Sequence, residues 1–485
     1  MFELYRPNPI RIGKICVNKC VDTPAFFSTS NFGGGGTNVA RFLAYGNLLS
    51  NVNVKLLMNY YYLNVNSGCS PRFDADVISD FNRDDLTVAD LVSMAVRKYQ
   101  NKVHDFGNSI TAQKWDSFVM LDSGSGNILR DTSLGRGEDA LKYYSDIIFD
   151  YLNFLETHKF DIGISMDFTL KNTYKNNENR DNIYLEKLRE VISRNSDLSE
   201  LTLRILQDWK GTFKPNLFAP LHGSSISEYT EYLDRILAIE IKMGKKFDGF
   251  AIGGLGKFSL DKSDGFGVPL AGSGDVKEAL YLFNTVSAVR SSLSKKQDIR
   301  PIHVLGSASL YNLIPLLLAG ADTFDDHSAW RRSSDGNDQS KDTVKRSISG
   351  NLTKEEMKTS SGMSKMVVPM LDDEGEFIKE NKENYLQYLG LHSLSDDNCR
   401  LDSLSLHYFS LKEIKQLYTG NVEDNYLAKI VMYLYSIDQY NKIISKLKTL
   451  TSKEDVIEFI RNMPDCNYKT FLSNFIKVSD WMELD

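Results

Sequence analysis

The stretch from Pro301 to Trp330, PIHVLGSASLYNLIPLLLAGADTFDDHSAW, decides the fold. A short apolar run breaks at Gly306, apolar residues then recur at helical spacing up to Gly320, and a second apolar run ends on Asp325. The succession of strand, helix and strand predicts a parallel β/α unit. In a closed α/β barrel, residues just past the strand ends line the active site. Asp325 is therefore a candidate catalytic carboxylate, and the alternative is an Asp that caps the next turn.

The same pattern recurs along the rest of the chain. Further apolar runs predict strands at 24–27, 54–58, 117–121, 161–166, 216–221 and 250–252, and helical periodicity follows at 85–103, 140–157 and 228–242. The residues that come directly after these strands are polar or glycine: Asp122, Asp167, His222–Gly223 and Gly253–Gly254. For His222 the alternative is a structural histidine satisfied by hydrogen bonds. Taken together, the pattern predicts an α/β fold, a TIM (β/α)8 barrel with insertions and a small C-terminal α-helical domain.

Composition sets limits on size, partners and compartment. With 485 residues, 42% hydrophobic, the chain exceeds one ordinary domain, so we expect a barrel domain at 1–395 and a helical region at 396–485. The start has no basic segment followed by an apolar one, and no run approaches the roughly 20 apolar residues of a membrane span. We expect a cytoplasmic protein, or one of the host cytoplasm if it is viral, with no membrane partner. A net charge of −7 does not fit a general nucleic-acid coat.

The five cysteines, at 16, 20, 69, 399 and 466, are odd in number and scattered. This distribution does not predict a disulfide framework. Cys16 and Cys20 are close enough to share a metal, but without a second close pair we expect them to be packing residues.

The segment from 331 to 365 is richer in basic residues than the rest of this acidic chain. It follows Asp325 directly, which places its cations near the predicted active site. We expect it to contact the phosphates of a nucleic acid through Arg331, Arg332, Lys345 and Arg346. The alternative is a solvated loop. From about Leu411 onward, helical periodicity predicts packing helices rather than active-site elements.

At this point the order of the motifs resembles a known family. The chain resembles the tRNA-guanine transglycosylase superfamily, which includes the queuine and archaeosine transglycosylases. The resemblance covers roughly residues 20–330. It rests on five motifs: Asp122-Ser123-Gly124-Ser125, Met166-Asp167, His222-Gly223, Gly253-Gly254-Leu255 and Gly320-Ala321-Asp322-Thr323-Phe324-Asp325. The Asp-Ser-Gly-Ser motif is similar to the archaeal branch and to the transglycosylases that place 7-deazaguanines in DNA. The resemblance implies base exchange, in which guanine leaves a nucleoside and a 7-deazaguanine takes its place.

The resemblance also implies roles for individual residues. Asp325 matches the covalent nucleophile, Asp122 the general acid/base, and Asp167 the residue that binds the purine edge. The remaining substrate-binding positions are Ser123, His222, Gly223, Gly253, Gly254 and Leu255. A carboxylate nucleophile would split the exchange into two steps, as in retaining glycosidases, while a second carboxylate with a raised pKa protonates the departing base. The substrate base must first be flipped out of its helix.

Three features depart from the family pattern. Gly126 stands where an aromatic residue usually stacks on the base, so we expect either that a tyrosine from Tyr60–Tyr62 stacks instead or that the pocket is wider. His222-Gly223 replaces Gln-Gly. The zinc ligands are replaced by Asp397, Cys399 and Asp402, a poor tetrahedral set, so we expect neither a structural zinc nor another cofactor.

Three functional hypotheses follow. We favour a transglycosylase acting on DNA, the first alternative is one acting on tRNA, and the second is a non-catalytic, nucleic-acid-binding partner subunit. The presence of both Asp122 and Asp325 argues against a non-catalytic subunit. The expected partners are thus a nucleic acid and a 7-deazaguanine base, with a homodimer left open.

Overall fold

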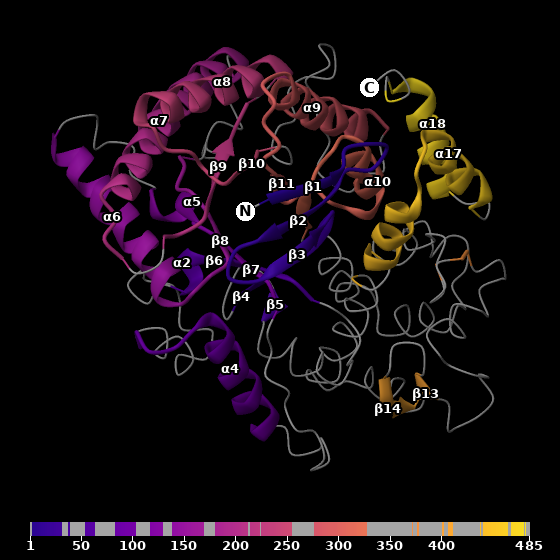
Figure 1. Cartoon of the computed structure of the whole chain (residues 1–485), viewed down its shortest axis with the longest axis horizontal. Helices are drawn as coiled ribbons and strands as arrows, with labels where there is room; N and C mark the ends of the chain where they lie inside the picture. Colours follow the sequence, from indigo (N-terminus) through magenta and orange to yellow (C-terminus); the bar gives the residue numbers. More distant parts are fainter. Residues whose placement is uncertain are drawn as a thin grey trace.

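The chain folds into a closed barrel of parallel strands surrounded by helices (Figure 1). A computed structural model describes residues 2–31, 37–38, 54–63, 83–102, 117–129, 138–168, 180–211, 214–223, 225–254, 276–326, 371, 376–377, 400–401, 406–410, 437, 440–463, 467–479 and 481. The eight barrel strands are β4 (Ala25–Asn31), β6 (Leu56–Asn59), β7 (Val119–Asp122), β8 (Ile162–Ile164), β9 (Leu217–Leu221), β10 (Gly249–Ile252), β11 (Ile302–Val304) and β12 (Thr323–Asp326). Pairing of β12 with β4 closes the barrel, which confirms the predicted (β/α)8 barrel.

Helices cover the outside of the barrel. They are α4 (Val88–Lys102), α6 (Glu138–Thr157), α7 (Arg180–Gln207), α8 (Ile226–Met243), α9 (Val276–Lys295) and α10 (Leu310–Leu318), with two short helices, α2 (Tyr60–Leu63) and α5 (Ser125–Ile128), near the strand ends. The bounds of α8 follow from its caps. The Ser225 hydroxyl accepts the backbone N–H of Glu228, and Gly244 ends the helix at φ +62°.

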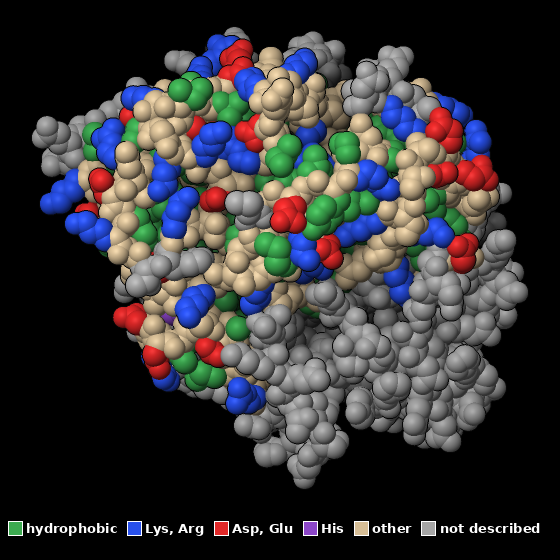
Figure 2. Space-filling view, in the orientation of Figure 1, with side chains coloured by type: hydrophobic (Ala, Val, Ile, Leu, Met, Phe, Trp, Pro, Cys, Tyr) green, Lys and Arg blue, Asp and Glu red, His purple; other side chains and the backbone are tan. Residues whose placement is uncertain are grey.

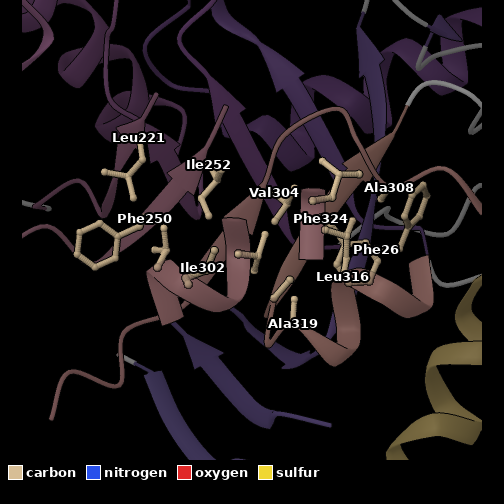
Figure 3. Close-up of a cluster of buried hydrophobic side chains, with 14 of the residues drawn as sticks. Phe26, Leu221, Phe250, Ile252, Ile302, Val304, Ala308, Leu316, Ala319 and Phe324 are labelled. Carbon is tan, nitrogen blue, oxygen red and sulfur yellow. The ribbon is translucent and has the colours of Figure 1, made fainter. Parts of the chain in front are cut away.

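Two apolar layers hold the barrel together. Between strands and helices, the side chains of β10, β11 and β12 meet those of α10 (Figure 3). Inside the barrel, a second cluster contains Phe27, Met120, Ile164 and Phe218. Barrel strands are buried on both faces, which explains why their sequences are nearly continuous apolar runs.

An antiparallel sheet of β1 (Phe2–Arg6), β2 (Ile12–Cys16) and β3 (Cys20–Thr23) covers the end of the barrel where the strands begin. Lys19 donates to the carbonyl of Ser117 at 2.8 Å, just before β7, and Asn18 donates to the carbonyl of Phe160 at 3.3 Å, just before β8. Ile15 and Val21 join the cluster inside the barrel. This end is therefore closed, and the strand ends that carry the predicted site lie at the opposite mouth.

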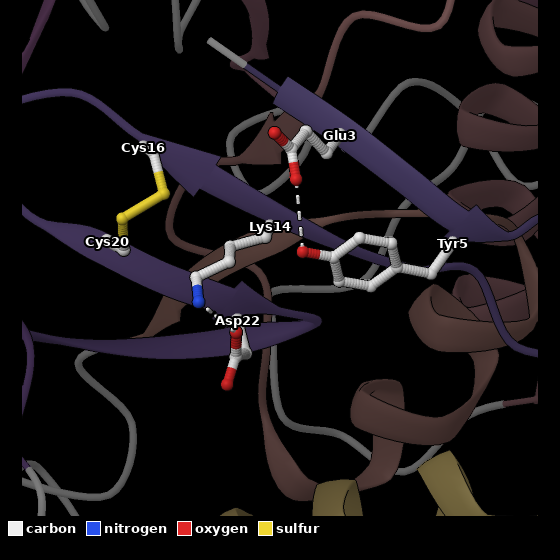
Figure 4. Close-up of a disulfide and its surroundings, with 6 residues drawn as sticks. All are labelled: Glu3, Tyr5, Lys14, Cys16, Cys20 and Asp22. Carbon is white, nitrogen blue, oxygen red and sulfur yellow. Dashed lines mark hydrogen bonds and ion pairs between the residues drawn. A yellow bond between two sulfur atoms is a disulfide. The ribbon is translucent and has the colours of Figure 1, made fainter.

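Cys16 and Cys20 form a disulfide (Figure 4). The prediction that they are only packing residues was wrong. They face each other in the register of β2 and β3, with Cα atoms 4.1 Å apart. Their spacing in the sequence is that of a tight hairpin, which places two β-carbons close enough to be joined.

Carboxylates at the beginnings of three strands accept backbone N–H groups from the neighbouring strand. Asp161 accepts from Val119 at 2.8 Å, Asp248 from Leu217 at 2.9 Å and Asp322 from Ile302 at 2.8 Å. They fix strand register at the closed end, whereas Asp122 and Asp325 lie at the other end of their strands. The aspartates that stabilise the barrel backbone are therefore different from the candidate catalytic aspartates.

The C-terminal helix α18 (Asn467–Val478) lies beside α9 and α10, and α17 (Lys453–Asn462) packs against α18 (Figure 1). Phe475 meets Phe283 edge to face at 5.4 Å, and Tyr311 meets Phe471 at 5.1 Å. Helical structure is confirmed for these segments and for 440–449. The strands β5 (Thr37–Asn38), β13 (Arg400–Leu401) and β14 (Leu406–Ser410) complete the described elements.

Candidate active site

The predicted catalytic carboxylates belong to the same mouth of the barrel. Asp122 is the last residue of β7, and Asp325 lies near the end of β12. Asp167 follows β8 by three residues, because that strand ends at Ile164, earlier than its apolar run predicted. The charges of Asp167 and Asp325 both raise the pKa of Asp122, so the three groups lie within electrostatic reach of one another.

The carboxylate of Asp325 is buried, and within the described part of the chain it accepts three hydrogen bonds. Its Oδ2 atom accepts the Thr29 hydroxyl at 2.9 Å, and its Oδ1 atom accepts the backbone N–H of Gly306 at 2.9 Å. The Nε2 atom of His303 lies 3.2 Å from the same Oδ1. With 4% of its surface exposed, Asp325 is held in a fixed orientation, as a nucleophile must be.

The carboxyl group of Asp122 is held differently. Asn59, its partner in the register of β6 and β7, donates to Oδ2 at 2.8 Å. Burial and, to a lesser extent, the charges of Asp167 and Asp325 together raise the pKa of Asp122 to about 7, although the hydrogen bonds from the Gly124 N–H and Asn59 lower it. A carboxyl that titrates near neutral pH can donate a proton in one step and accept one in the next.

Gly124 makes the turn after Asp122 possible. It has φ +62°, a left-handed conformation, and a β-carbon there would lie 2.2 Å from Oδ1 of Asn59. Glycine is therefore required both by the backbone and by the close approach of Asn59. This explains the Gly in the Asp-Ser-Gly-Ser motif in physical terms.

Asp167 lies between Ser125 and His222. The Ser125 hydroxyl donates to Oδ1 of Asp167, and the backbone N–H of Asp167 donates to Ser125 Oγ at 3.2 Å. The Nε2 atom of His222 lies 2.5 Å from Oδ2 of Asp167, in a contact that lacks the geometry of a hydrogen bond. The structure thus brings two predicted site residues, Asp167 and His222, together with Ser125. The hydroxyl of Ser123, a third predicted site residue, is buried and has no hydrogen-bond partner among the described residues.

The sequence did not predict a group of contacts that hold Phe168, the residue after Asp167. Asn195, on α7, accepts the N–H of Phe168 at 2.5 Å and donates to its carbonyl at 3.1 Å. The Arg194 guanidinium lies over the Phe168 ring, 4.2 Å from its centroid, and donates to the Tyr144 hydroxyl. These contacts fix the backbone next to Asp167. Residues 171–200 are polar and rich in Asn and Lys, a composition typical of a surface segment, so these contacts left no signal in the sequence.

The glycines after β9 and β10 pack tightly. A β-carbon on Gly223 would lie 2.9 Å from the backbone nitrogen of Tyr229, and one on Gly253 would lie 3.0 Å from the His222 ring. The Tyr229 hydroxyl donates to the carbonyl of Gly253 at 2.8 Å. Gly254 has φ +80°. Leu255 lies outside the described residues, as do Arg331, Arg332, Lys345 and Arg346.

Of the tyrosines expected to stack on a base, Tyr60 is not available. It is 4% exposed and packs edge to face against Tyr151 at 5.2 Å and Phe154 at 5.0 Å, on the helix side of the barrel. Tyr61 is half-buried, and its β-carbon lies 2.7 Å from the position of a β-carbon built on Gly124. Tyr61 is thus the tyrosine of this group that lies next to the Asp122 turn.

Asp397, Cys399 and Asp402 lie outside the described residues, and among those described no group of three or more His, Cys, Asp or Glu side chains is arranged to hold a metal ion. Lys and Arg side chains alternate with Asp and Glu over the face shown in Figure 2. Among the helices described, none has the length and apolar character needed to cross a membrane.

The raised pKa of Asp122 predicts a pH-dependent stability. A carboxyl whose pKa rises from 3.8 unfolded to about 7 folded contributes stability that is present at low pH and is lost as pH rises through 7. Asp122→Asn cannot ionise, so its free energy of unfolding relative to wild type should increase by on the order of 3 kcal/mol between about pH 4 and about pH 8. Urea unfolding across this range measures it, and a difference independent of pH would show that Asp122 titrates normally.

Comparison of the chain with protein-family models and with curated proteins finds no match.

Proposed function

We propose that this protein is a base-exchange transglycosylase, which replaces guanine in DNA with a 7-deazaguanine derivative through a covalent aspartyl-glycosyl intermediate. One observation carries the proposal. At one barrel mouth, Asp325 accepts three hydrogen bonds, while Asp122 has a pKa of about 7. Two carboxyl groups in such different environments suit the two roles that glycosyl transfer requires.

Asp325 suits the nucleophile. Displacement of a base from C1′ passes through an oxocarbenium-like state, and a carboxylate on the opposite side of the sugar can form a glycosyl ester. The hydrogen bonds from Thr29, His303 and Gly306 keep the carboxylate oriented without neutralising it. A second displacement by the incoming base then restores the original configuration at C1′.

Asp122 suits the general acid and base. The departing guanine needs a proton, and the incoming base must lose one. A carboxyl with a pKa of about 7 exists in both forms near neutral pH, so one group can serve both half-reactions. Its location at the end of β7 and the influence of the Asp325 charge on its pKa support action on the same sugar.

The Asp167 and His222 pair suits recognition of guanine. Guanine carries N–H donors at N1 and N2 beside an acceptor at O6. A carboxylate accepts two donors at once, and an imidazole N–H donates to an acceptor. Asp167 and His222 are in contact at 2.5 Å, so the two side chains can face the same edge of one purine. Adenine reverses this donor and acceptor pattern and should be rejected.

Incubation of the protein with radiolabelled guanine and a polymer tests the proposal. We expect label to enter duplex DNA, and labelled adenine to remain free. A parallel arm with tRNA distinguishes the two polymers, and label in tRNA alone would replace DNA as the substrate while retaining the chemistry. Binding of nucleic acid without incorporation in either arm would contradict base exchange and would favour the non-catalytic partner subunit.

A further inference from the structure

The two oxygens of the Asp325 carboxylate are not equivalent. Oδ1 faces two donors, the Gly306 N–H at 2.9 Å and His303 Nε2 at 3.2 Å, whereas Oδ2 faces the Thr29 hydroxyl at 2.9 Å. A carboxylate oxygen has two lone pairs in the plane of the group. Both lone pairs of Oδ1 are engaged by these contacts, and among the described residues Thr29 alone bonds to Oδ2, so one lone pair of Oδ2 takes no hydrogen bond from this part of the chain.

His303 is placed for this contact by the barrel itself. It is fully buried on β11, opposite Thr323 in the register of β11 and β12, and its Nδ1 atom lies 2.9 Å from the Thr323 hydroxyl. The Phe27 ring meets the imidazole edge to face at 6.1 Å. The ring is thus held at both nitrogens and on one side.

The partners determine which ring nitrogen carries the proton. An ionised carboxylate can only accept hydrogen bonds, so Nε2 must carry a proton to bind Asp325. Nδ1 of a neutral ring then accepts from the Thr323 hydroxyl, which can donate. Thr323 therefore acts on Asp325 through His303, by selecting the tautomer.

We propose that His303 is a positioning residue: together with the Gly306 N–H it holds Oδ1 of Asp325, so that Oδ2 is the atom that attacks C1′. This inference rests on the proposed function. As the bond between Oδ2 and C1′ forms, the bond between C1′ and the guanine nitrogen breaks, its electron pair leaves with guanine, and Asp122 gives the base its proton.

His303 also assists the second half-reaction. In the glycosyl ester, Oδ1 is the carbonyl oxygen, still facing the His303 and Gly306 donors. When the incoming base attacks C1′ and gives its proton to Asp122, the electron pair of the ester bond returns to Asp325. Donors at Oδ1 stabilise the charge that develops there.

Three substitutions separate positioning from packing. The amide nitrogen of Gln reaches the position of imidazole Nε2, whereas that of Asn reaches only the position of Nδ1. We expect His303→Leu and His303→Asn to lower kcat roughly 10- to 100-fold with little change in KM, and His303→Gln to recover most of it. Equal kcat values for the Gln and Asn variants, or a Leu variant as active as wild type, would overturn the proposal. The Asn and Gln pair keeps the test valid if the Leu variant does not fold.

A second measurement does not depend on activity. In nitrogen-15 spectra of protein labelled at histidine, the signals lost in His303→Gln belong to His303. We expect its Nε2 to carry the proton and its Nδ1 to have the shift of an unprotonated nitrogen. A proton on Nδ1 alone would overturn the proposal, whether or not the protein exchanges bases. Failure of the wild-type protein to incorporate guanine would instead count against the proposed function.

Discussion

Asp325→Asn is expected to abolish base exchange, with kcat reduced at least about 10⁴-fold. An amide cannot form the glycosyl ester, yet it has nearly the same shape as the carboxylate. Its oxygen can accept from Gly306 and His303, and its NH2 group can donate to Thr29, so the local hydrogen bonds are retained. Guanine incorporation under single-turnover conditions measures the loss.

Nucleic-acid binding and thermal unfolding serve as controls for this variant. Both should stay close to wild type, because the substitution removes one charge and no contact. Appreciable exchange by Asp325→Asn, with both controls intact, would remove Asp325 from the mechanism.

The largest effect on stability is expected at Asp322. Its carboxylate is fully buried and accepts the Arg11 guanidinium at 2.8 Å, the Arg290 guanidinium, and the N–H of Ile302. Asp322→Ala would leave two buried guanidinium groups without their counter-charge. Breaking such a pair typically costs roughly 3–5 kcal/mol. Urea unfolding should show a loss of this size.

The electrostatics of Arg290 support this expectation. Burial lowers the pKa of Arg290, and the nearby charge of Asp322 limits the fall to about 10. Asp234→Ala provides the matched control, because Asp234 pairs with Lys296 at 2.9 Å on the surface, where ion pairs contribute little. If Asp322→Ala and Asp234→Ala unfolded at the same urea concentration, the buried network would not stabilise the barrel.

The barrel was predictable because its signals are local. Each strand is a short apolar run, each helix has its own periodicity, and Asp122 and Asp325 stand where runs end. Barrel geometry then places strand ends at one mouth, so proximity of the two carboxylates follows from topology without any knowledge of side-chain contacts.

The groups that hold those carboxylates were not predictable in the same way. Thr29 bonds to Asp325 across 296 positions of sequence, and Asn195 holds Phe168 from a helix whose composition is typical of a surface. His303 was taken as one member of an apolar strand, since its neighbours are aliphatic. The Cys16–Cys20 disulfide depends on hairpin register, which the spacing permits but does not specify.

The most direct test of the mechanism is to trap its intermediate. Protein mixed with guanine-containing DNA and no incoming base, then denatured and digested, should yield a peptide that contains Asp325 and carries the sugar of a strand that has lost one guanine. The adduct should be absent from Asp325→Asn and should disappear when free base is added. An adduct on a different residue, or base exchange by wild-type protein without any adduct, would contradict a covalent aspartyl intermediate at Asp325.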